Sequence, residues 1–427
     1  MTTSATASTA GKTHPQARRA IISSSIGNAL EWFDILIYGA FAVVIAKQFF
    51  PAGNETVSLL LTFGTFGVSF FMRPLGAVVL GAYSDRVGRK SALMLSIMLM
   101  TIGTALIAFM PNYETIGLLA PAGIAIGKMI QGFSAGGEFG SSTAFLVEHA
   151  PHRRGFFSSW QVASQGISLL LAAIFGAALN NLLTADQLAS WGWRIPFIFG
   201  LLIAPAGIYI RRHLEESPEF SESDHTTSKP LQETFSTQKM RLFIGTGCVI
   251  MATVSVYLSL YIPTYAVKQL GMPAWSSFAA MSVAGLIMAV GSPLVGELSD
   301  KYGRTPFMIV SSALFVVLTY PMFLYLSNNP NFGTLLMLQA VIGVLMTLYF
   351  ASMPALLADI FPVQTRGTGM SLAYNIAVTI FGGFAGLIIT WLIDVTGDKL
   401  SVSYFVIFGA VLSVLASVSA RAVLKLK

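Results

Sequence analysis

Five ionisable side chains interrupt stretches of the sequence that are otherwise apolar. They are Glu31, Asp34, Arg73, Lys128 and Glu138. An ionisable group at membrane depth costs about 2.5–3.5 kcal/mol on insertion scales, so such residues commonly pair with each other or act on a solute. A cation can hold an anionic solute, and a desolvated carboxylate can take up and release a proton as its surroundings change. These residue types therefore predict either a proton-coupled site for a charged solute or a set of structural ion pairs.

The choice between a functional site and a structural ion pair depends on the residue. Arg73 can form a structural ion pair with Asp34 or Glu31, and Glu138 can meet arginines near the inner end of its segment. Paired charges are the ordinary state inside a helix bundle, so both alternatives stay open. Lys128 lies near the middle of its apolar segment, too deep for its ammonium group to reach the membrane surface easily. For Lys128 we therefore favour a role in function.

Neutral polar residues recur at helical spacing beside these charges. In the first segment Asn28, Glu31, Asp34 and Tyr38 fall within a third of a helix circumference, at about 100° per residue. Other segments supply further candidate ligands of a polar solute, which are Gln131, Gln161, Gln165, Tyr257, Tyr261 and Asn375. The charged groups lie in the first half of the chain, whereas the neutral residues Tyr257, Tyr261 and Asn375 lie in the second half. This asymmetry favours a binding site between two halves.

Composition places all of these residues in membrane-spanning helices. The chain of 427 residues is 54% hydrophobic and only 10% charged, whereas soluble proteins carry about 25% charged residues. A helix needs about 20 apolar residues to cross a bilayer. Suitable segments lie near residues 20–46, 57–82, 91–110, 115–147, 155–182, 192–213, 241–267, 275–297, 305–327, 332–358, 367–394 and 402–424. The sequence predicts an all-α membrane protein of twelve transmembrane helices in two pseudo-symmetric six-helix bundles.

The distribution of Lys and Arg supports this count and gives the orientation. With both termini inside, 19 of the 25 Lys and Arg residues lie on the inner side, and only Lys47, Lys268 and Lys399 lie on the outer side. Such a bias is typical of the cytoplasmic face of membrane proteins. The net charge of +6 therefore reflects membrane orientation, and we expect no nucleic acid partner.

Polar stretches divide the chain. Residues 1–19 are Ser/Thr-rich without an apolar core, which predicts a disordered cytoplasmic N-terminus and no cleavable signal peptide. We expect a first bundle at 20–213, a cytoplasmic linker at 214–240, a second bundle at 241–424 and a short cytoplasmic tail at 425–427.

A cationic hairpin occurs twice, which indicates a duplication. GAYSDRVGRK, residues 81–90, returns as GELSDKYGRT, residues 296–305, about half a chain later. Both copies lie between long apolar segments on the predicted inner side.

The inventory of metal ligands and nucleophiles argues against an enzyme. The single cysteine, Cys248, excludes an internal disulfide and a thiolate metal cage, and the five histidines fall in predicted loops or at helix ends. We expect no catalytic residue, no metal site and no cofactor.

Several runs resemble the metabolite–proton symporter branch of the major facilitator superfamily. The doubled hairpin resembles the signature of the superfamily, and the branch is indicated by GNALEWFDILIYG, FMRPLGAVVLGAYSDRVGRK, QGFSAGGEFG, SWGWRIPF and FPVQTRGTGMSLAYNIAVTIFGG. Within it, YIPTYA and VTGDK are most similar to bacterial citrate and tricarballylate symporters. The resemblance implies two bundles that rock about a central cavity and import a carboxylate with protons.

The resemblance also implies that the hairpins are gates. The residues given this role are Gly81, Asp85, Arg86, Gly88, Arg89, Gly296, Asp300 and Arg304. Asp85 would pair with hairpin arginines and the opposite half. Two positions depart from the family pattern: Lys128 stands where many relatives have arginine, and Lys301–Tyr302 replaces an arginine-bearing pair, which predicts a weaker second latch.

We therefore expect a monomeric, multi-pass protein of a bacterial inner membrane that imports a di- or tricarboxylate with protons. Arg73 and Lys128 would supply positive potential, Asn28 and the six neutral residues named above would bind carboxylate oxygens, and Glu31, Asp34 or Glu138 would carry the proton. The alternatives are a proton symporter for a zwitterion such as betaine or proline, a symporter for another small organic acid, a channel and a transporter-like sensor.

Overall fold

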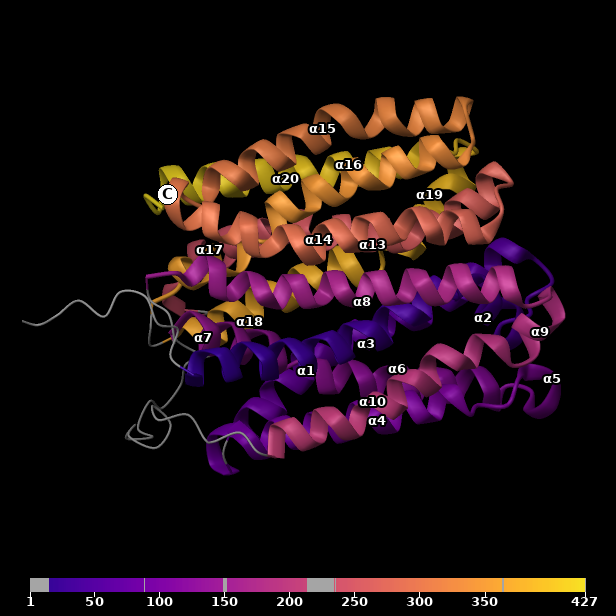
Figure 1. The fold of residues 1–427 in the computed structure, drawn as a ribbon, viewed down its shortest axis with the longest axis horizontal. Helices are drawn as coiled ribbons and strands as arrows, with labels where there is room; N and C mark the ends of the chain where they lie inside the picture. The colour runs from indigo at the N-terminus through magenta and orange to yellow at the C-terminus, as the bar shows by residue number, and fades with distance from the viewer. Residues whose placement is uncertain are drawn as a thin grey trace, which may run out of the picture.

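The chain folds into helices that lie side by side along one common direction (Figure 1). The computed structural model describes residues 15–87, 89–148, 152–212, 234, 236–362 and 365–426, and it contains no β-strand within these ranges. The helices of the first half are α1 (Pro15–Ala40), α2 (Ala42–Phe49), α3 (Glu55–Val87), α4 (Arg89–Ala108), α5 (Tyr113–Ile116), α6 (Leu119–Ala135), α7 (Glu138–Glu148), α8 (Arg154–Leu182), α9 (Ala185–Ser190) and α10 (Ile195–Arg212). Those of the second half are α13 (Lys239–Leu270), α14 (Ala274–Tyr302), α15 (Thr305–Asn328), α16 (Phe332–Phe350), α17 (Met353–Ile360), α18 (Arg366–Ala377), α19 (Ala385–Thr396) and α20 (Ser401–Ala422).

These helices make up the twelve predicted crossings. In the described part of the chain, eight helical segments are long and apolar enough to span a membrane, and the bent pair α1–α2 makes a ninth. The shorter apolar helices α4 and α10 and the consecutive pair α6–α7 correspond to the remaining three. The predicted segments therefore match, with two corrections at their ends. Residues 15–19, predicted to be disordered, belong to α1, and Lys239 and Met240, predicted to be linker, belong to α13. Residues 1–14 and most of the predicted linker lie outside the described residues.

Several crossings are interrupted, which the sequence did not predict. The first bends by 66° between α1 and α2. The fourth breaks between α6 and α7 and the tenth between α16 and α17. In the eleventh, residues Val378–Gly383 form a π-helical turn between α18 and α19. Such turns are frequent at functional sites because they redirect side chains.

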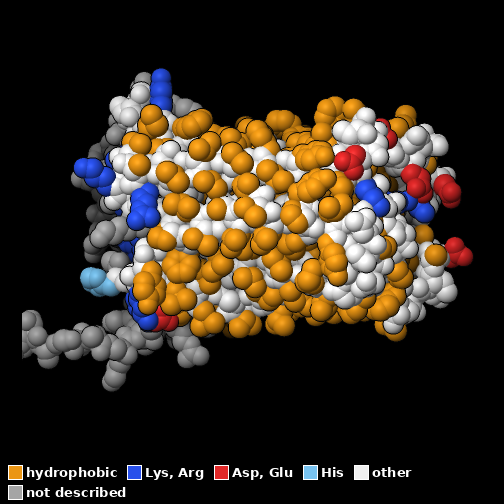
Figure 2. Space-filling model, turned by 90° about the horizontal axis from the view of Figure 1, so that it is seen from above, with side chains coloured by type: hydrophobic (Ala, Val, Ile, Leu, Met, Phe, Trp, Pro, Cys, Tyr) orange, Lys and Arg blue, Asp and Glu red, His pale blue; other side chains and the backbone are white. Residues whose placement is uncertain are grey.

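The surface agrees with a membrane protein. Figure 2 shows a broad band of hydrophobic side chains between one end that carries Lys and Arg and another where Asp and Glu gather. The basic end is cytoplasmic by the charge bias of membrane proteins.

Close helix contacts in the first bundle depend on glycine. A Cβ atom at Gly132 of α6 would overlap the Ser69 carbonyl of α3, and one at Gly76 of α3 would overlap the Phe133 carbonyl of α6. Gly136 likewise lies against the Arg73 carbonyl. Small residues let helix backbones approach in this way. Because Arg73 belongs to this seam, the seam positions a predicted site residue.

Gly136→Ala is therefore expected to lower the thermal stability of the purified chain in detergent. Its Cβ would clash with backbone atoms, among them the Ala77 nitrogen at 2.7 Å, which cannot move as a side chain can. Overpacking of this kind costs roughly 1–3 kcal/mol. The neighbouring Gly137→Ala is the control, because its Cβ would meet Leu80 Cβ at an ordinary 3.6 Å. Equal melting temperatures for the two variants would contradict the assignment.

The two bundles meet along α8 and α14. A Cβ at Gly166 of α8 would lie 2.5 Å from the Ala289 nitrogen of α14, and one at Gly285 of α14 would lie 2.6 Å from the Leu170 nitrogen of α8. Figure 1 shows the two helices running side by side. This seam holds the halves together along most of their length.

Candidate substrate and proton site

An ion pair and two tyrosines meet where the bundles face each other. Arg73 of α3 and Glu31 of α1 are both buried, and their closest nitrogen and oxygen are 3.9 Å apart. That separation is longer than a hydrogen bond, so charge rather than a hydrogen bond holds these two atoms. Tyr257 of α13 and Tyr374 of α18 lie within electrostatic reach of both charges. We name Glu31, Arg73, Tyr257 and Tyr374 the interdomain cluster.

Aromatic rings surround the interdomain cluster. The Arg73 guanidinium carbon lies 4.6 Å from the centre of the Phe70 ring. The Tyr257 ring lies 5.7 Å from Phe70, 6.0 Å from Phe66 and 6.3 Å from Trp32, measured between ring centres. A low-polarity wall of this kind strengthens the interactions of the charges that it encloses.

Lys128 lies deeper in the first bundle than the interdomain cluster. Its ammonium nitrogen is 4.4 Å from the centre of the Tyr38 ring and 5.3 Å from that of Phe66, within cation–π range. The residue is 1% exposed. Because Phe66 also packs against Tyr257, we place this ring between Lys128 and the cluster.

A chain of hydrogen bonds joins Lys128 to Asp34. The Lys128 ammonium donates to Gln131 Oε1 over 2.9 Å, and Gln131 Nε2 donates to the Thr104 hydroxyl over 2.9 Å. That hydroxyl in turn donates to Asp34 Oδ2. We name Lys128, Gln131, Thr104 and Asp34 the buried relay. Thr104 lies on α4, so three helices of the first bundle build the relay.

Some buried polar atoms have no hydrogen-bond partner in the described part of the chain. Among them are both amide atoms of Gln165, the Tyr257 hydroxyl and Asn375 Oδ1. Burying a polar group without a partner costs about 1–3 kcal/mol, so each such atom calls for an explanation, and a bound polar solute is one. Gln165 and Tyr257 are thus predicted ligands whose donors this structure leaves open to a solute. Asn375 Nδ2 already donates to the Gly136 and Ser371 carbonyls, so only its acceptor oxygen is open.

The other predicted ligands are engaged within the protein. Asn28 Nδ2 donates to the Gln161 carbonyl over 2.9 Å and to the Ser164 hydroxyl over 2.8 Å. The Gln161 side chain bonds Thr143 and Ser142. The Tyr261 and Thr390 hydroxyls are 2.9 Å apart. These contacts join helices, so in this conformation Asn28, Gln161 and Tyr261 position neighbouring elements.

The three predicted proton carriers, Glu31, Asp34 and Glu138, lie in different surroundings. Glu31 belongs to the interdomain cluster and Asp34 to the buried relay. Glu138 is buried at the start of α7, directly after the break in the fourth crossing. The four residues from Asn28 to Tyr38 that share one helix face thus contact different neighbours.

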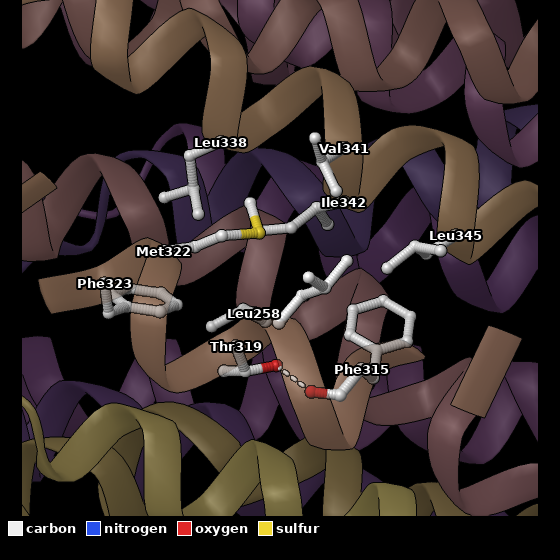
Figure 3. A pocket seen from close by; sticks show the side chains of 10 residues that line it. Leu258, Phe315, Thr319, Met322, Phe323, Leu338, Val341, Ile342 and Leu345 are labelled. Carbon is white, nitrogen blue, oxygen red and sulfur yellow. Dashed lines mark hydrogen bonds between the residues drawn. The ribbon is translucent and has the colours of Figure 1, made fainter. Parts of the chain in front are cut away.

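A separate cavity in the second bundle does not suit an anion. It measures about 10 Å³ and lies between α13, α15 and α16. Figure 3 shows that its lining is almost wholly aliphatic and aromatic, and that the Thr319 hydroxyl is bonded to the Phe315 carbonyl. The site for a charged solute is better sought at the interdomain cluster.

At the cytoplasmic end, the second hairpin joins the two halves. Asp300 accepts hydrogen bonds from the backbone N–H groups of Gly155 and Phe156 at the start of α8, over 2.8 and 2.9 Å. A carboxylate is stabilised there by the exposed N–H groups and the helix dipole. Gly296 permits the approach, because its Cβ would lie 2.6 Å from the Gly155 carbonyl oxygen. Arg304 bonds Asp300 over 3.2 Å.

Asp359 completes this contact, and sequence reasoning missed it. It pairs with Arg154 of the first half over 3.0 Å and with Arg304 of the second half. We name Arg154, Asp300, Arg304 and Asp359 the cytoplasmic latch. For the first hairpin, Gly88 lies outside the described residues, as do the side chains of Asp85, Arg86 and Arg89 and the surroundings of Gly81. The relative strength of the two latches therefore stays a prediction.

The halves also touch near the outer face. The Lys268 ammonium of α13 lies 2.6 Å from the Glu55 carboxylate of α3. Phe63 packs against Tyr261 with ring centres 5.7 Å apart, and Phe41 against Phe278 at 6.1 Å. With the cytoplasmic latch also formed, the bundles are in contact on both sides of the interdomain cluster. In the described part of the chain the halves thus touch near both the outer and the cytoplasmic face.

Comparison with known proteins identifies the family. The sequence matches the Major Facilitator Superfamily over residues 24–324 and again over 280–426. The chain belongs to the major facilitator superfamily. Membership confirms the predicted family and fold class, and it makes the chain a membrane transporter rather than an enzyme.

Individual members of the superfamily are similar over nearly the whole chain. The citrate-proton symporter of Klebsiella pneumoniae is 40% identical over 403 residues, which cover 93% of this chain and 90% of that protein. The citrate-proton symporter of Salmonella typhi is 38% identical over 401 residues, covering 93% and 92%. The proline/betaine transporter of Salmonella typhimurium is 32% identical over 421 residues, covering 95% and 83%.

Solved structures show the same fold at lower identity. A D-xylose-proton symporter superposes with a TM-score of 0.72 at 19% identity, covering 95% of this chain and 97% of that one. A proton:xylose symporter bound to 6-bromo-6-deoxy-D-glucose gives a TM-score of 0.74 at 18% identity, covering 95% of each chain. Identities this low support the architecture alone.

Proposed function

We propose that this chain is a proton-coupled symporter that imports a di- or tricarboxylate such as citrate by alternating access. The observation that carries the proposal is Arg73, a buried cation between the two bundles. Beside it lies Tyr257, whose buried hydroxyl has no partner among the described residues, and the same holds for the Gln165 amide on α8. Charge-assisted hydrogen bonds from such groups are the strong contacts to carboxylates. The similarity to two citrate-proton symporters supports the same substrate class.

The aromatic rings favour an anion over a betaine as substrate. Quaternary ammonium groups bind over aromatic faces. Here Lys128 lies over Tyr38 and Phe66, and Arg73 lies over Phe70. Protein cations thus occupy these faces, and the same cations offer positive potential to an anion.

Asp34 is our first candidate for the coupling proton. It is 6% exposed, and the buried relay connects it to Lys128. Protonation of Asp34 would leave Lys128 without its anionic counterpart, which raises the positive potential that a carboxylate meets at the cluster. Proton and substrate would then favour each other's binding. Glu31 and Glu138 are the alternative carriers.

Membrane voltage sets a condition on the number of protons. Moving one net charge across 100 mV is worth about 2.3 kcal/mol. An inside-negative potential therefore opposes entry of a trianion unless the protons at least balance its charges, and it drives entry only if they outnumber them. Uptake that rises with an inside-negative potential would indicate such an excess.

The transport cycle would move residues 20–213 against residues 241–424. The cytoplasmic latch would hold the inner side closed, and the contacts of Glu55 with Lys268 and of Phe63 with Tyr261 would close the outer side. Because the exposed outer ion pair contributes little energy, the aromatic contacts would carry most of that closure.

Uptake into proteoliposomes tests the proposal. Radiolabelled citrate should accumulate inside against its gradient when the outside is acidic, and a protonophore should abolish the accumulation. Competition by unlabelled tricarballylate would support a carboxylate substrate, and competition by glycine betaine would support a zwitterionic one. Accumulation that ignores the protonophore would exclude proton symport, and unsaturable flux without accumulation would indicate a channel.

Breaking the cytoplasmic latch is expected to open the inner side. Asp359→Asn leaves Arg154 and Arg304 without their shared anion, which destabilises the state closed on the inner side by roughly 1–3 kcal/mol. The equilibrium between closed and open inner sides should then shift toward the open form by roughly 5- to 150-fold. The readout is maleimide labelling of Ser299→Cys, a position only 1% exposed, in a Cys248→Ala background that removes the single native cysteine. Labelling should accelerate in Asp359→Asn.

The exposed neighbour Glu297 supplies the control for this prediction. It pairs with Arg153 over 3.6 Å, and both side chains are more than two-fifths exposed. Glu297→Gln removes the same charge but should change labelling little, since exposed pairs contribute about 0–1 kcal/mol. Unchanged labelling in Asp359→Asn would show that Asp359 does not hold the inner side closed.

A further inference from the structure

A small cavity lies beside Asp34 within the first bundle. It measures about 20 Å³ and is lined by α1, α4 and α10 alone. None of its lining residues belongs to the interdomain cluster or to the second bundle. The cavity is therefore separate from the space between the halves where we expect the substrate.

One oxygen of Asp34 is available to this cavity. Oδ2 accepts the hydrogen bond from Thr104, while Oδ1 is buried and has no partner in the described part of the chain. Gly200 of α10 keeps the space beside Oδ1 open, since a Cβ there would lie 2.6 Å from this oxygen. A buried carboxylate oxygen is thus directed at a cavity rather than at a protein donor.

The cavity is large enough for one water molecule. A water needs about 10–15 Å³ of such space and two to four polar partners. Asp34 Oδ1 can accept one of its protons. The Thr101 hydroxyl, which donates to the Ile97 carbonyl over 2.7 Å, can accept the other.

The side chains that flank the cavity differ in burial between its outer and its cytoplasmic side. One turn outward on its three helices lie Ile37, Ile107 and Phe197, all 0% exposed. One turn inward lie Ile26, Met94 and Ile208, which are all part-exposed. The flanking side chains named here are thus fully buried on the outer side of the cavity and part-exposed on its cytoplasmic side.

The charged groups that act on Asp34 come from other helices than α4 and α10. Lys128 of α6 acts on it electrostatically and is joined to it through Gln131 and Thr104. On α1 itself Glu31 is paired with Arg73 of α3. The cavity residues of α4 and α10 carry no charge. The Lys and Arg residues of these two helices stand at their cytoplasmic ends, Arg89 and Lys90 on α4 and Arg211 and Arg212 on α10.

We propose that this cavity binds a water molecule through which the coupling proton leaves Asp34 toward the cytoplasm, apart from the path of the substrate. The proposal rests on the proposed function, which assigns that proton to Asp34. The protonated carboxyl group gives its proton to the water, which becomes hydronium. The carboxylate that remains keeps its hydrogen bond from Thr104.

Two substitutions in the cavity test this exit route. Thr101→Val removes the second water partner without changing the volume much, and Ala204→Leu fills the cavity. Proteoliposomes report three rates: citrate uptake driven by a pH gradient, acidification of an internal pH dye, and exchange of internal for external citrate without a gradient. Both variants should slow uptake and acidification severalfold and leave exchange unchanged. Ile102→Phe is the control, because this α4 residue is 54% exposed on the outer surface of the bundle.

The outcomes separate this proposal from the proposed function. If Asp34→Asn uncouples transport while Thr101→Val and Ala204→Leu both match the unsubstituted chain, the exit route is wrong and the proton assignment survives. If exchange falls in proportion with uptake, the cavity affects substrate movement and the exit route is wrong. If Asp34→Asn still accumulates citrate with protons, both assignments fail. Should Ala204→Leu melt at a lower temperature, Thr101→Val decides.

Discussion

Asp34→Asn is expected to abolish proton-driven accumulation of carboxylate while exchange across the membrane continues. Asparagine has nearly the shape of aspartate and can still accept the hydrogen bond from Thr104. It cannot take up a proton at pH values where proteins fold, so the step that couples protons to transport is lost. Exchange of one carboxylate for another needs no net movement of protons and should persist.

The rate of uptake should depend on external pH in the unsubstituted chain but not in Asp34→Asn. In the unsubstituted chain, a lower external pH protonates Asp34 more often, so the rate of uptake should rise as the outside becomes acidic. In Asp34→Asn the rate should be nearly independent of external pH. The measurement is initial uptake of labelled citrate into proteoliposomes over a series of external pH values at fixed voltage.

The other buried carboxylates provide matched controls. Glu31→Gln and Glu138→Gln each remove one negative charge from the first bundle, as Asp34→Asn does. We expect both to retain accumulation driven by a pH gradient, although Glu31→Gln changes substrate affinity because it frees Arg73. If Glu31→Gln is uncoupled and Asp34→Asn is not, the proton is carried in the interdomain cluster.

The sequence predicted the crossings well because membrane burial leaves a strong signal. Long apolar segments and the inward bias of Lys and Arg are both read from residue order alone, and the predicted segments match the helices closely. The breaks were missed for a physical reason. Gly136 and Gly137 also permit close helix contact, so they do not distinguish a break from a continuous helix. Pro354 follows the break at Ala351–Ser352, but Pro263 and Pro293 lie inside continuous helices, so a proline does not distinguish the two cases either.

The site was predicted in part, because sequence gives depth and face but not neighbours. The five buried charges were found from their apolar surroundings. Glu31 and Asp34 are less than one turn apart, yet one meets α3 and the other meets α4. Thr104 and Asp359 were missed, since a threonine in an apolar helix and an aspartate at a helix end are both common. Only the packing shows that they hold the relay and the latch.

The division of labour between the two cations follows from their surroundings. Arg73 lies in the interdomain cluster, whereas the Lys128 ammonium is enclosed by Gln131 and two rings. The sequence favoured Lys128 as the central ligand. The geometry leads us to propose that Arg73 contacts the substrate carboxylate directly. Lys128, on the other side of the Phe66 ring, would attract the carboxylate only through its charge. Lys128→Gln should then alter the pH dependence of uptake more than the affinity.

Arg73→Gln is expected to weaken citrate binding by roughly 10- to 150-fold, the equivalent of about 1.5–3 kcal/mol for a hydrogen bond to a charged group. Arg73→Lys should bind with intermediate affinity, because lysine keeps the charge but loses the planar fork that fits a carboxylate. The measurement is the dissociation constant of citrate for the purified protein by calorimetry.

A second substitution separates binding from stability in this experiment. Arg73→Gln alone leaves Glu31 as a buried charge without its ion-pair partner, which destabilises proteins by about 3–5 kcal/mol. The double variant Arg73→Gln, Glu31→Gln removes both charges and should recover most of the lost melting temperature. It should not recover affinity, because the cation that meets the carboxylate is still missing. If the double variant binds citrate as tightly as the unsubstituted chain, Arg73 is a structural partner of Glu31, and the substrate is held elsewhere in the cluster.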